Sequence, residues 1–211
     1  MERWNGLRRG RQTPIGLRKS QAHCRERKRR IYENAPMKTL GLLRHAKSDW
    51  DDMSKRDFDR GLNARGRRGA ALMGAHIREG EQSWDVVLAS PAERVKRTLE
   101  SAELGVSPQF DQRLYLSSAE TMIDVVQEKA GDADSVLIVA HNPGMQEMLL
   151  KLIAPSNENA LFDEASVKFP TAAYAVIELD IESWKELGGE DGTLTLFTRP
   201  RDLDAELGPE H

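Results

Sequence analysis

Three apolar segments of the sequence each run into side chains that can bind or attack a phosphoryl group. The first segment ends on Arg44 and His45, the second is followed by Arg94, and the third ends on His141. Arginine binds anionic oxygens with a planar fork of N–H donors, and a neutral imidazole is a nucleophile. These residue types, each close to the end of an apolar run, predict chemistry on a phosphoryl group.

The apolar runs themselves predict β-strands, and helical patterns lie between them. The expected strands are residues 38–44, 85–90, 135–141, 172–179 and 193–199. The expected helices are residues 63–80, 90–105, 117–131 and 142–153. Three of the strands lack the alternation of a half-exposed sheet, which is typical of parallel strands buried on both faces. Two strands near the end of the chain favour a hairpin or antiparallel edge. The predicted fold class is therefore α/β, a three-layer α/β/α sandwich with a mostly parallel sheet.

Residues at the helix starts predict how the chain turns out of each strand. Asn63 is an expected N-cap, and Gly80 is expected to end the same helix. Ser90 and Asn142 each precede a proline, a pattern typical of an N-cap followed by the first helical residue. Both of these helices are therefore expected to begin directly at a strand end.

The carboxyl ends of parallel strands share one edge of a sheet, where such folds bind their ligands. Arg44, His45, Arg94 and His141 are therefore expected to converge on one crevice, together with helix N-termini that offer N–H groups. Arginine forks match phosphate oxygens better than they match a single carboxylate. The sequence has no aspartate cluster or phosphate-binding glycine loop beside these groups. We therefore expect no metal and no cofactor in the reaction.

The motifs LLRHAKSDW, SPAERVKRT and VAHNPG resemble the three signature blocks of the histidine phosphatase superfamily, also called phosphoglycerate mutase-like. The similarity covers residues 37 to about 199 and is greatest to the SixA-type phosphohistidine phosphatases. The resemblance implies that His45 accepts the phosphoryl group and that Arg44, Arg94 and His141 bind it. The segment DRGLNARG resembles a further part of this branch, which implies that Arg60 is another phosphate ligand.

The chain departs from the family pattern at the general acid. Mutase-type members supply a glutamate after a middle strand, and the corresponding segment FDQRLYLSSAE has no obvious equivalent. Asp49, Asp51 and Asp52 follow the expected nucleophile, and nothing in the sequence selects one of them. A missing acid favours phosphohistidine as substrate, because an imidazole can leave with its own proton whereas an alkoxide needs one delivered.

These observations predict a metal-independent phosphatase that works through a phosphohistidine intermediate on His45. The preferred partner is a protein that carries phosphohistidine. The alternatives are a phosphomonoesterase of the same superfamily that acts on a small phosphate ester, and a phospho-binding module without turnover.

Charge divides the 211 residues into two unlike parts, although the whole chain has a net charge of only −3. Residues 1–36 contain 11 lysines and arginines but only 3 acidic residues. Residues 37–211 contain 20 lysines and arginines and 31 acidic residues. The basic arm could bind nucleic acid, act as a transit peptide, or precede a true start at Met37; we favour the last and do not expect nucleic acid as a partner. We expect one phosphatase domain at 37–200 and an acidic tail at 201–211.

The sequence has no apolar run long enough for a membrane span and no secretory leader pattern. Cys24, in the basic arm, is the single cysteine, so the predicted domain has no disulfide. These features predict a cytoplasmic protein without a membrane partner.

Overall fold

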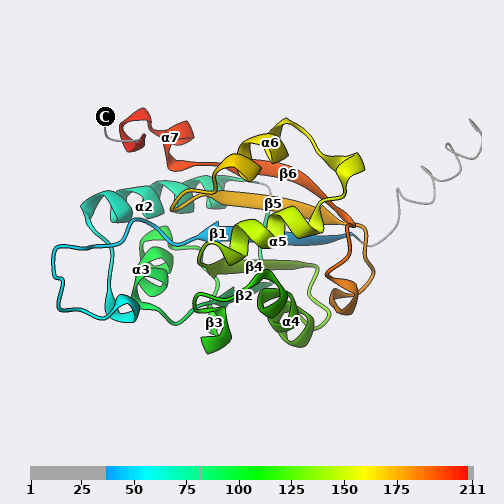
Figure 1. Cartoon of the computed structure of the whole chain (residues 1–211), viewed down its shortest axis with the longest axis horizontal. Helices are drawn as coiled ribbons and strands as arrows, with labels where there is room; N and C mark the ends of the chain where they lie inside the picture. Colours follow the sequence, from blue (N-terminus) through cyan, green and yellow to red (C-terminus); the bar gives the residue numbers. More distant parts are fainter. Residues whose placement is uncertain (1–36, 81, 209–211) are drawn as a thin grey trace, which may run out of the picture. The chain divides into compact units, whose positions relative to one another are not determined.

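The structure is a computed structural model that describes residues 37–80 and 82–208. The predictions for the basic arm concern residues outside this part of the chain. The sheet has six strands in the order β3-β2-β4-β1-β5-β6 (Figure 1). The strands are β1 (Lys38–Arg44), β2 (Val86–Ala89), β3 (Gln109–Phe110), β4 (Ser135–Ala140), β5 (Tyr174–Leu179) and β6 (Gly192–Thr198). The first four are mutually parallel, and β5 runs antiparallel to its neighbours β1 and β6. The predicted α/β fold with a mostly parallel sheet is confirmed.

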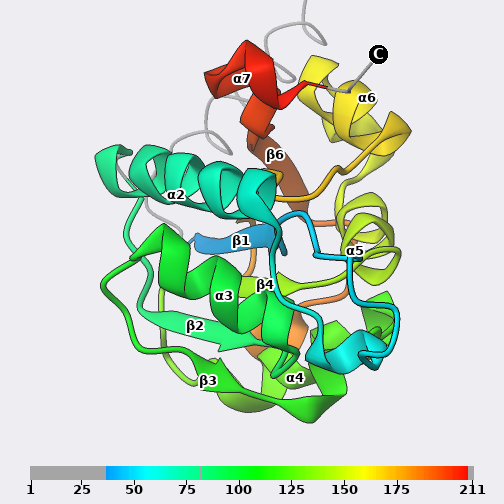
Figure 2. The ribbon, with the colours of Figure 1, turned by 90° about the vertical axis from the view of Figure 1, so that its left-hand side faces the viewer.

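Helices cover both faces of this sheet. They are α2 (Ala64–Glu79), α3 (Glu93–Ala102), α4 (Ala119–Lys129), α5 (Gly144–Leu152), α6 (Ala160–Val167) and α7 (Pro200–Leu203). Figure 2 shows α2 and α3 together on one side of β1 and β4, with α5 and α6 on the other side. Apolar side chains of α4, α5 and α6 belong to one buried cluster, and those of α2 and α3 belong to another. The sheet therefore lies between two helical layers.

Strand β1 is buried on both faces, as its unbroken apolar sequence predicts. Leu40 and Leu42 belong to the cluster with α4, α5 and α6, whereas Leu43 belongs to the cluster with α2 and α3. Burying each of these side chains contributes about 1.5–3 kcal/mol. Gly41 packs closely against Trp84, and a Cβ at this position would lie only 2.4 Å from the indole ring. The strand that ends at the candidate site is thus fixed on both sides.

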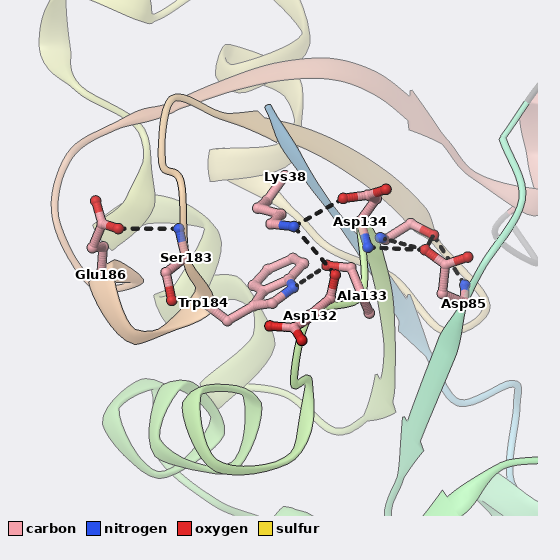
Figure 3. Close-up of polar contacts among 9 residues, drawn as sticks. Lys38, Asp85, Asp132, Ala133, Asp134, Ser183, Trp184 and Glu186 are labelled. Carbon is pink, nitrogen blue, oxygen red and sulfur yellow. Dashed lines mark hydrogen bonds and ion pairs between the residues drawn. The ribbon is translucent and has the colours of Figure 1, made fainter. Parts of the chain in front are cut away.

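A polar network holds the opposite end of the sheet (Figure 3). Lys38 at the start of β1 donates to Asp134 Oδ1 at 2.9 Å, and Asp85 Oδ2 accepts from the backbone N–H of Ser135 at 2.9 Å. The Trp184 indole N–H donates to the Ala133 carbonyl at 2.6 Å. These contacts tie the beginnings of β1 and β4 to the segment before β2. They fix the relative register of the strands far from the strand ends that carry the predicted catalytic residues.

The helix starts agree only in part with the sequence prediction. Asn63 caps α2 as expected, since its Oδ1 accepts from the Gly66 N–H at 2.7 Å, and α2 ends before Gly80. The predicted cap at Ser90 is wrong, because α3 begins after Ala92, whose methyl side chain cannot cap it. The predicted cap at Asn142 is also wrong, because its amide donates to the Phe169 carbonyl at 3.0 Å. In both cases the polar side chain forms a hydrogen bond with a group from another part of the chain and does not cap the helix.

The end of the described chain is more ordered than an acidic tail would be. Residues 200–203 form α7 and a further helical turn, η5, spans Ala205–Leu207. Arg68 on α2 forms ion pairs with Asp204 and with Glu206, the latter at 2.8 Å. These acidic residues are therefore matched to the basic face of α2, which places part of the predicted tail in the folded domain.

Candidate active site

The backbone of β1 carries Arg44 and His45 to the centre of the sheet edge. The Arg44 N–H donates to the Ala173 carbonyl at 3.0 Å, and the His45 N–H donates to the Ala140 carbonyl at 3.1 Å. The two residues are thus held between β4 and the segment that leads into β5. Their positions depend on the sheet, so we expect little backbone movement when a ligand arrives.

The His45 ring is held in one tautomer. Its Nδ1 lies 2.8 Å from the Ala46 carbonyl oxygen. A carbonyl can only accept a hydrogen bond, so Nδ1 carries the proton and Nε2 keeps its lone pair. Burial, aided by the charges of Arg94 and Arg44, lowers the pKa of His45 to about 3. The imidazole is therefore neutral at pH 7, and its free nitrogen can act as a nucleophile.

His141 follows β4 and faces the first histidine. The centroids of the His45 and His141 rings are 5.0 Å apart. His141 Nε2 lies 2.8 Å from the Ser90 hydroxyl, while its buried Nδ1 has no hydrogen-bond partner among the described residues. Burial, with further repulsion from His45 and Arg94, lowers the pKa of His141 to about 3. His141 is thus neutral in the free protein, so it could hold phosphoryl oxygens as a cation only after taking up a proton with the ligand.

Arg94 reaches the same place from α3 and already contacts an anion of the protein. Its Nη1 donates to the Asp57 carbonyl at 2.7 Å, and its Nη2 lies 3.0 Å from Asp57 Oδ2. The Tyr115 hydroxyl donates to the same oxygen at 2.7 Å. Burial opposes ionisation of Asp57, but the Tyr115 hydrogen bond and the Arg94 charge outweigh it and lower the pKa. Asp57 is therefore a carboxylate at neutral pH.

Arg44 supplies a second cation beside Arg94. Its Nη1 donates to the Phe169 carbonyl at 2.7 Å, and its buried Nε has no hydrogen-bond partner in the part of the chain that the structure describes. Burial, followed by repulsion from Arg94, lowers the pKa of Arg44. Two guanidinium groups that repel one another over two neutral histidines form a site that an anion would stabilise.

Arg60 is buried but is directed toward a loop. Its guanidinium donates to the carbonyls of Asp52 and Lys55, each at 2.9 Å, and stacks over the Trp50 ring at 4.3 Å. No contact in the described residues joins Arg60 to His45. The structure thus brings together four of the five predicted site residues, and phosphate binding by Arg60 stays a prediction.

Of the described carboxylates, Asp57 is the one that acts electrostatically on His45 and His141, and none of the three aspartates considered as acids does so. Asp49 Oδ1 accepts from the Asp51 N–H, and Asp52 Oδ1 accepts from the Ser54 N–H, as in ordinary turns. Asp57, which the sequence analysis did not single out, is the carboxylate that contacts Arg94. The sequence contains one indication of Asp57, which is that it lies three residues before the predicted phosphate ligand Arg60.

The comparisons with known proteins agree with this geometry. The family model of the histidine phosphatase superfamily (branch 1) matches residues 40–115, which include Arg44, His45 and Arg94. The Mycobacterium leprae protein ML1117, of uncharacterized function, is 31% identical over 164 residues, which are 75% of this chain and all of that relative. The chain belongs to the histidine phosphatase superfamily. Membership of this superfamily supports phosphatase activity.

Solved structures place the chain near the SixA type of this superfamily. A putative phosphohistidine phosphatase SixA from Nakamurella multipartitia has a TM-score of 0.70 and 27% identity, and the match covers 78% of this chain and 96% of that one. A putative phosphohistidine phosphatase SixA from Agrobacterium tumefaciens has a TM-score of 0.64 and 27% identity over 77% and 99% of the two chains. The predicted SixA-type relationship is confirmed.

No helix in residues 37–80 and 82–208 is long and apolar enough to cross a membrane. In the same part of the chain, no group of three or more histidine, cysteine, aspartate and glutamate side chains could hold a metal ion.

Proposed function

We propose that the protein hydrolyses phosphohistidine in proteins without a metal ion, through a phosphohistidine intermediate on His45. The observation that carries this proposal is the neutral His45 ring, whose Nδ1 proton is fixed on the Ala46 carbonyl 2.8 Å away. The free Nε2 is thus a nucleophile beside two arginines that can bind phosphoryl oxygens. Nothing further has to be deprotonated before attack.

In the first step, His45 Nε2 forms a bond to phosphorus while the phosphorus–nitrogen bond of the substrate breaks. The electron pair of that bond leaves with the substrate imidazole, whose other ring nitrogen carries a proton, so that the leaving group is neutral. Arg44 and Arg94 stabilise the charge on the three equatorial oxygens. Arg94 can do so only by exchanging part of its contact with Asp57 for the ligand. We propose that Arg60 adds a further contact after releasing its loop carbonyls.

In the second step, water attacks the phosphoryl group on His45. The bond between phosphorus and His45 Nε2 breaks, and that nitrogen recovers its lone pair. Asp57 is ionised and interacts electrostatically with both His45 and His141. We propose that this carboxylate accepts the proton of the attacking water.

The state of Asp57 favours a phosphoramidate over an ester. An alkoxide leaving group needs a proton from an acid, and Asp57 holds none in the free protein because its pKa is lowered. An imidazole leaving group does not need a proton from the enzyme, because it can leave with its own. The SixA structures from two organisms, described as putative phosphohistidine phosphatases, support the same substrate class.

The surroundings of the site suit a macromolecular substrate. Trp50 and Met53 in the loop after β1 are 54% and 75% exposed, and Leu116, next to Tyr115, is 55% exposed. Exposed apolar side chains commonly mark protein contacts. They support a protein that carries phosphohistidine as the partner of the site.

The alternative is a phosphomonoesterase that acts on a small ester. The observation in its favour is Asp57 itself, since an arriving phosphoryl dianion would raise the pKa of a neighbouring carboxyl. A protonated Asp57 could then serve as the acid. This alternative requires Asp57 for the first step, whereas the preferred reaction does not.

The test is the initial rate of phosphate release from a phosphohistidine-bearing protein in the presence of a chelator, for the unmodified chain and for His45→Ala. Quenching with alkaline detergent, which preserves the acid-labile phosphorus–nitrogen bond, reports any phosphohistidine formed on the enzyme from labelled substrate. We expect release and labelling by the unmodified chain and neither by His45→Ala. Release that persists in His45→Ala would refute the nucleophile, and hydrolysis of small esters alone would select the alternative. Binding without release by the unmodified chain would indicate a phospho-binding module.

A further inference from the structure

A cavity with a volume of about 340 Å³ lies beside the candidate active site. Its walls come from the residues after β1, the first turns of α2, the segment between α6 and β5, and the start of α7. The full lining is Ala46, Lys47, Asn63, Arg65, Gly66, Gly69, Lys168, Pro170, Thr171, Ala172, Arg199, Pro200, Arg201 and Leu207. His45, Arg94 and His141 do not line it, so the cavity is distinct from the phosphoryl site. A cavity of this size is in the range of small-molecule sites.

The lining of the cavity is strongly basic. It contains five lysines and arginines and no aspartate or glutamate. The rest of the domain has the opposite balance, since residues 37–211 hold 20 basic and 31 acidic residues. Cations gathered around a hollow in an acidic domain create a local positive potential, which attracts anions.

Three of these cations form no ion pair with a carboxylate of the described residues, although Arg201 acts electrostatically on the neighbouring Asp202. Arg199 is neutralised, because it forms ion pairs with Glu164 at 2.6 Å and Asp202 at 2.8 Å. In the part of the chain that the structure describes, no carboxylate lies within ion-pairing distance of Lys47, Lys168 or Arg201. All three side chains are exposed, so they can turn toward an anion in the cavity. Their mutual repulsion would be relieved by such a ligand.

The amino end of α2 adds to the same field. Asn63, Arg65 and Gly66 line the cavity, and α2 begins at Ala64. The first N–H groups of a 16-residue helix carry a partial positive charge toward whatever lies at that end. The helix end and the lysines and arginines therefore both favour a negatively charged ligand.

Apolar surface lies beside the cations. Pro170, Pro200 and Leu207 contribute to the wall, together with Ala46 and Ala172. An inorganic ion would leave this surface uncovered, whereas an organic molecule with a phosphoryl group would contact both kinds of wall. We propose that the cavity binds a small phosphorylated organic molecule, held by Lys47, Lys168 and Arg201.

The cavity wall also supports the backbone of the nucleophile. The Ala172 N–H donates to the carbonyls of Arg44 and His45, each at 3.1 Å, and the Asn63 N–H donates to the Lys47 carbonyl at 3.2 Å. A ligand in the cavity would thus contact the segments that hold residues 44–47 in place. The proposal itself concerns binding and does not depend on the compound that His45 attacks.

The test is a titration followed by the amide NMR signals of Gly66, Gly69 and Thr171, with AMP and inorganic phosphate as probes. His45→Ala serves as the background for AMP so that no turnover occurs, and inorganic phosphate is also titrated into the unmodified chain. We expect saturable shifts at these three amides, with AMP bound at least ten-fold more tightly than phosphate. Equal affinities would overturn the assignment of an organic ligand.

A double variant with two reversed charges, compared with a control variant, completes the experiment. Lys168→Glu combined with Arg201→Glu should weaken AMP binding at the three amides by at least ten-fold. Lys185→Glu makes a charge change on an exposed lysine that does not line the cavity, and it should leave the affinity unchanged. Thermal unfolding of each variant verifies that it is folded. Shifts confined to the surroundings of His141 and Arg94, no saturable shift with either probe, or undiminished binding in the double variant would each refute the proposal.

Discussion

Arg94 and Asp57 are joined at two points: Arg94 Nη1 donates to the Asp57 carbonyl at 2.7 Å, and Nη2 lies 3.0 Å from its carboxylate. The arginine is nearly buried, whereas the aspartate is about half exposed. The free protein thus presents a carboxylate to the cation that a phosphoryl group would use. Any phosphoryl ligand must compete with Asp57 for Arg94.

Asp57→Asn should therefore tighten the binding of inorganic phosphate. The substitution removes a negative charge from an anion site. The Asp57 carboxylate is about half exposed and screened by solvent, so we expect only a modest decrease in the inhibition constant, on the order of three-fold. The measurement is competitive inhibition by phosphate. Asp59→Asn is the matched control, because Asp59 pairs with exposed Arg56 and not with Arg94. Weaker phosphate binding in Asp57→Asn would contradict the competition.

The same variant separates the two candidate reactions. If Asp57 must donate a proton to an alkoxide, Asp57→Asn should lower kcat for small esters by about 100-fold or more. The first step with phosphohistidine needs no such acid and should lose much less. The rate of enzyme labelling in a single turnover isolates this step from the later attack by water. Equal losses with both substrates would refute the distinction.

Ser90→Ala should lower kcat/KM through His141. The Ser90 hydroxyl is the hydrogen-bond partner of His141 Nε2 at 2.8 Å, so its loss frees the ring, and we expect a decrease in kcat/KM on the order of ten-fold. Loss of one buried hydrogen bond should also lower the free energy of unfolding by about 1 kcal/mol.

Ser135→Ala is the control for this stability loss. Ser135 is also buried and its hydroxyl donates to Asp85 at 3.0 Å, but it lies at the other end of β4. We expect a similar decrease in stability with unchanged kcat/KM. A comparable loss of activity in both variants would mean that stability, and not the orientation of His141, accounts for the Ser90 effect.

The sequence predicted the centre of the site because the sheet does most of the positioning. Arg44, His45 and His141 lie at or just beyond the ends of buried strands, and Arg94 lies in the first turn of a helix that follows such a strand. Parallel pairing of β1, β2 and β4 then brings these positions to one edge. Apolar strand patterns and their order were enough to predict that meeting point.

Side chains that depend on loops or on distant partners were not predictable in the same way. Asp57 meets Arg94 only because the loop after β1 folds back onto α3, and no periodic pattern determines that path. Ser90 has the residue type and position of an N-cap, but buried His141 provides a competing partner. The two-residue strand β3 and helix α6 were missed, since each is too short or too weakly patterned to stand out.

The lowered pKa values of the two histidines predict how stability depends on pH. Both histidines are buried with pKa values of about 3, whereas in the unfolded chain each has the ordinary value of 6.5. Between these values the unfolded state binds protons that the native state does not. The free energy of unfolding should therefore fall as the pH drops below 6.5, by up to about 1.4 kcal/mol per pH unit for each histidine.

Urea unfolding at pH 7, 6 and 5 measures this slope. His141→Gln removes one of the two titrating groups, and the decrease in stability between pH 6 and pH 5 should be shallower than in the unmodified chain. Phosphate, which favours protonation of the histidines when bound, should reduce the slope in the unmodified chain. An identical slope in His141→Gln would show that His141 already binds its proton in the native state.

Helix α2 packs directly against the segment that carries the nucleophile. A Cβ at Gly66 would lie 2.1 Å from the Lys47 carbonyl oxygen, which is a backbone atom two residues beyond His45. Gly66→Ala must therefore push α2 and this segment apart. We expect a loss of stability of about 2 kcal/mol or more and a fall in kcat, because His45 would move with the segment.

Gly69→Ala is the matched control, one turn further along the same helix. A Cβ there would be 3.8 Å from Pro200, an ordinary van der Waals distance. Alanine is also the better helix former by about 1 kcal/mol, so this variant should be as stable as the unmodified chain or more so, with kcat unchanged. Measuring both variants by urea unfolding and by steady-state kinetics compares the same chemical change with and without the contact to Lys47. If Gly66→Ala kept full stability and kcat, the close packing of α2 on the Lys47 carbonyl would not be what holds His45 in place.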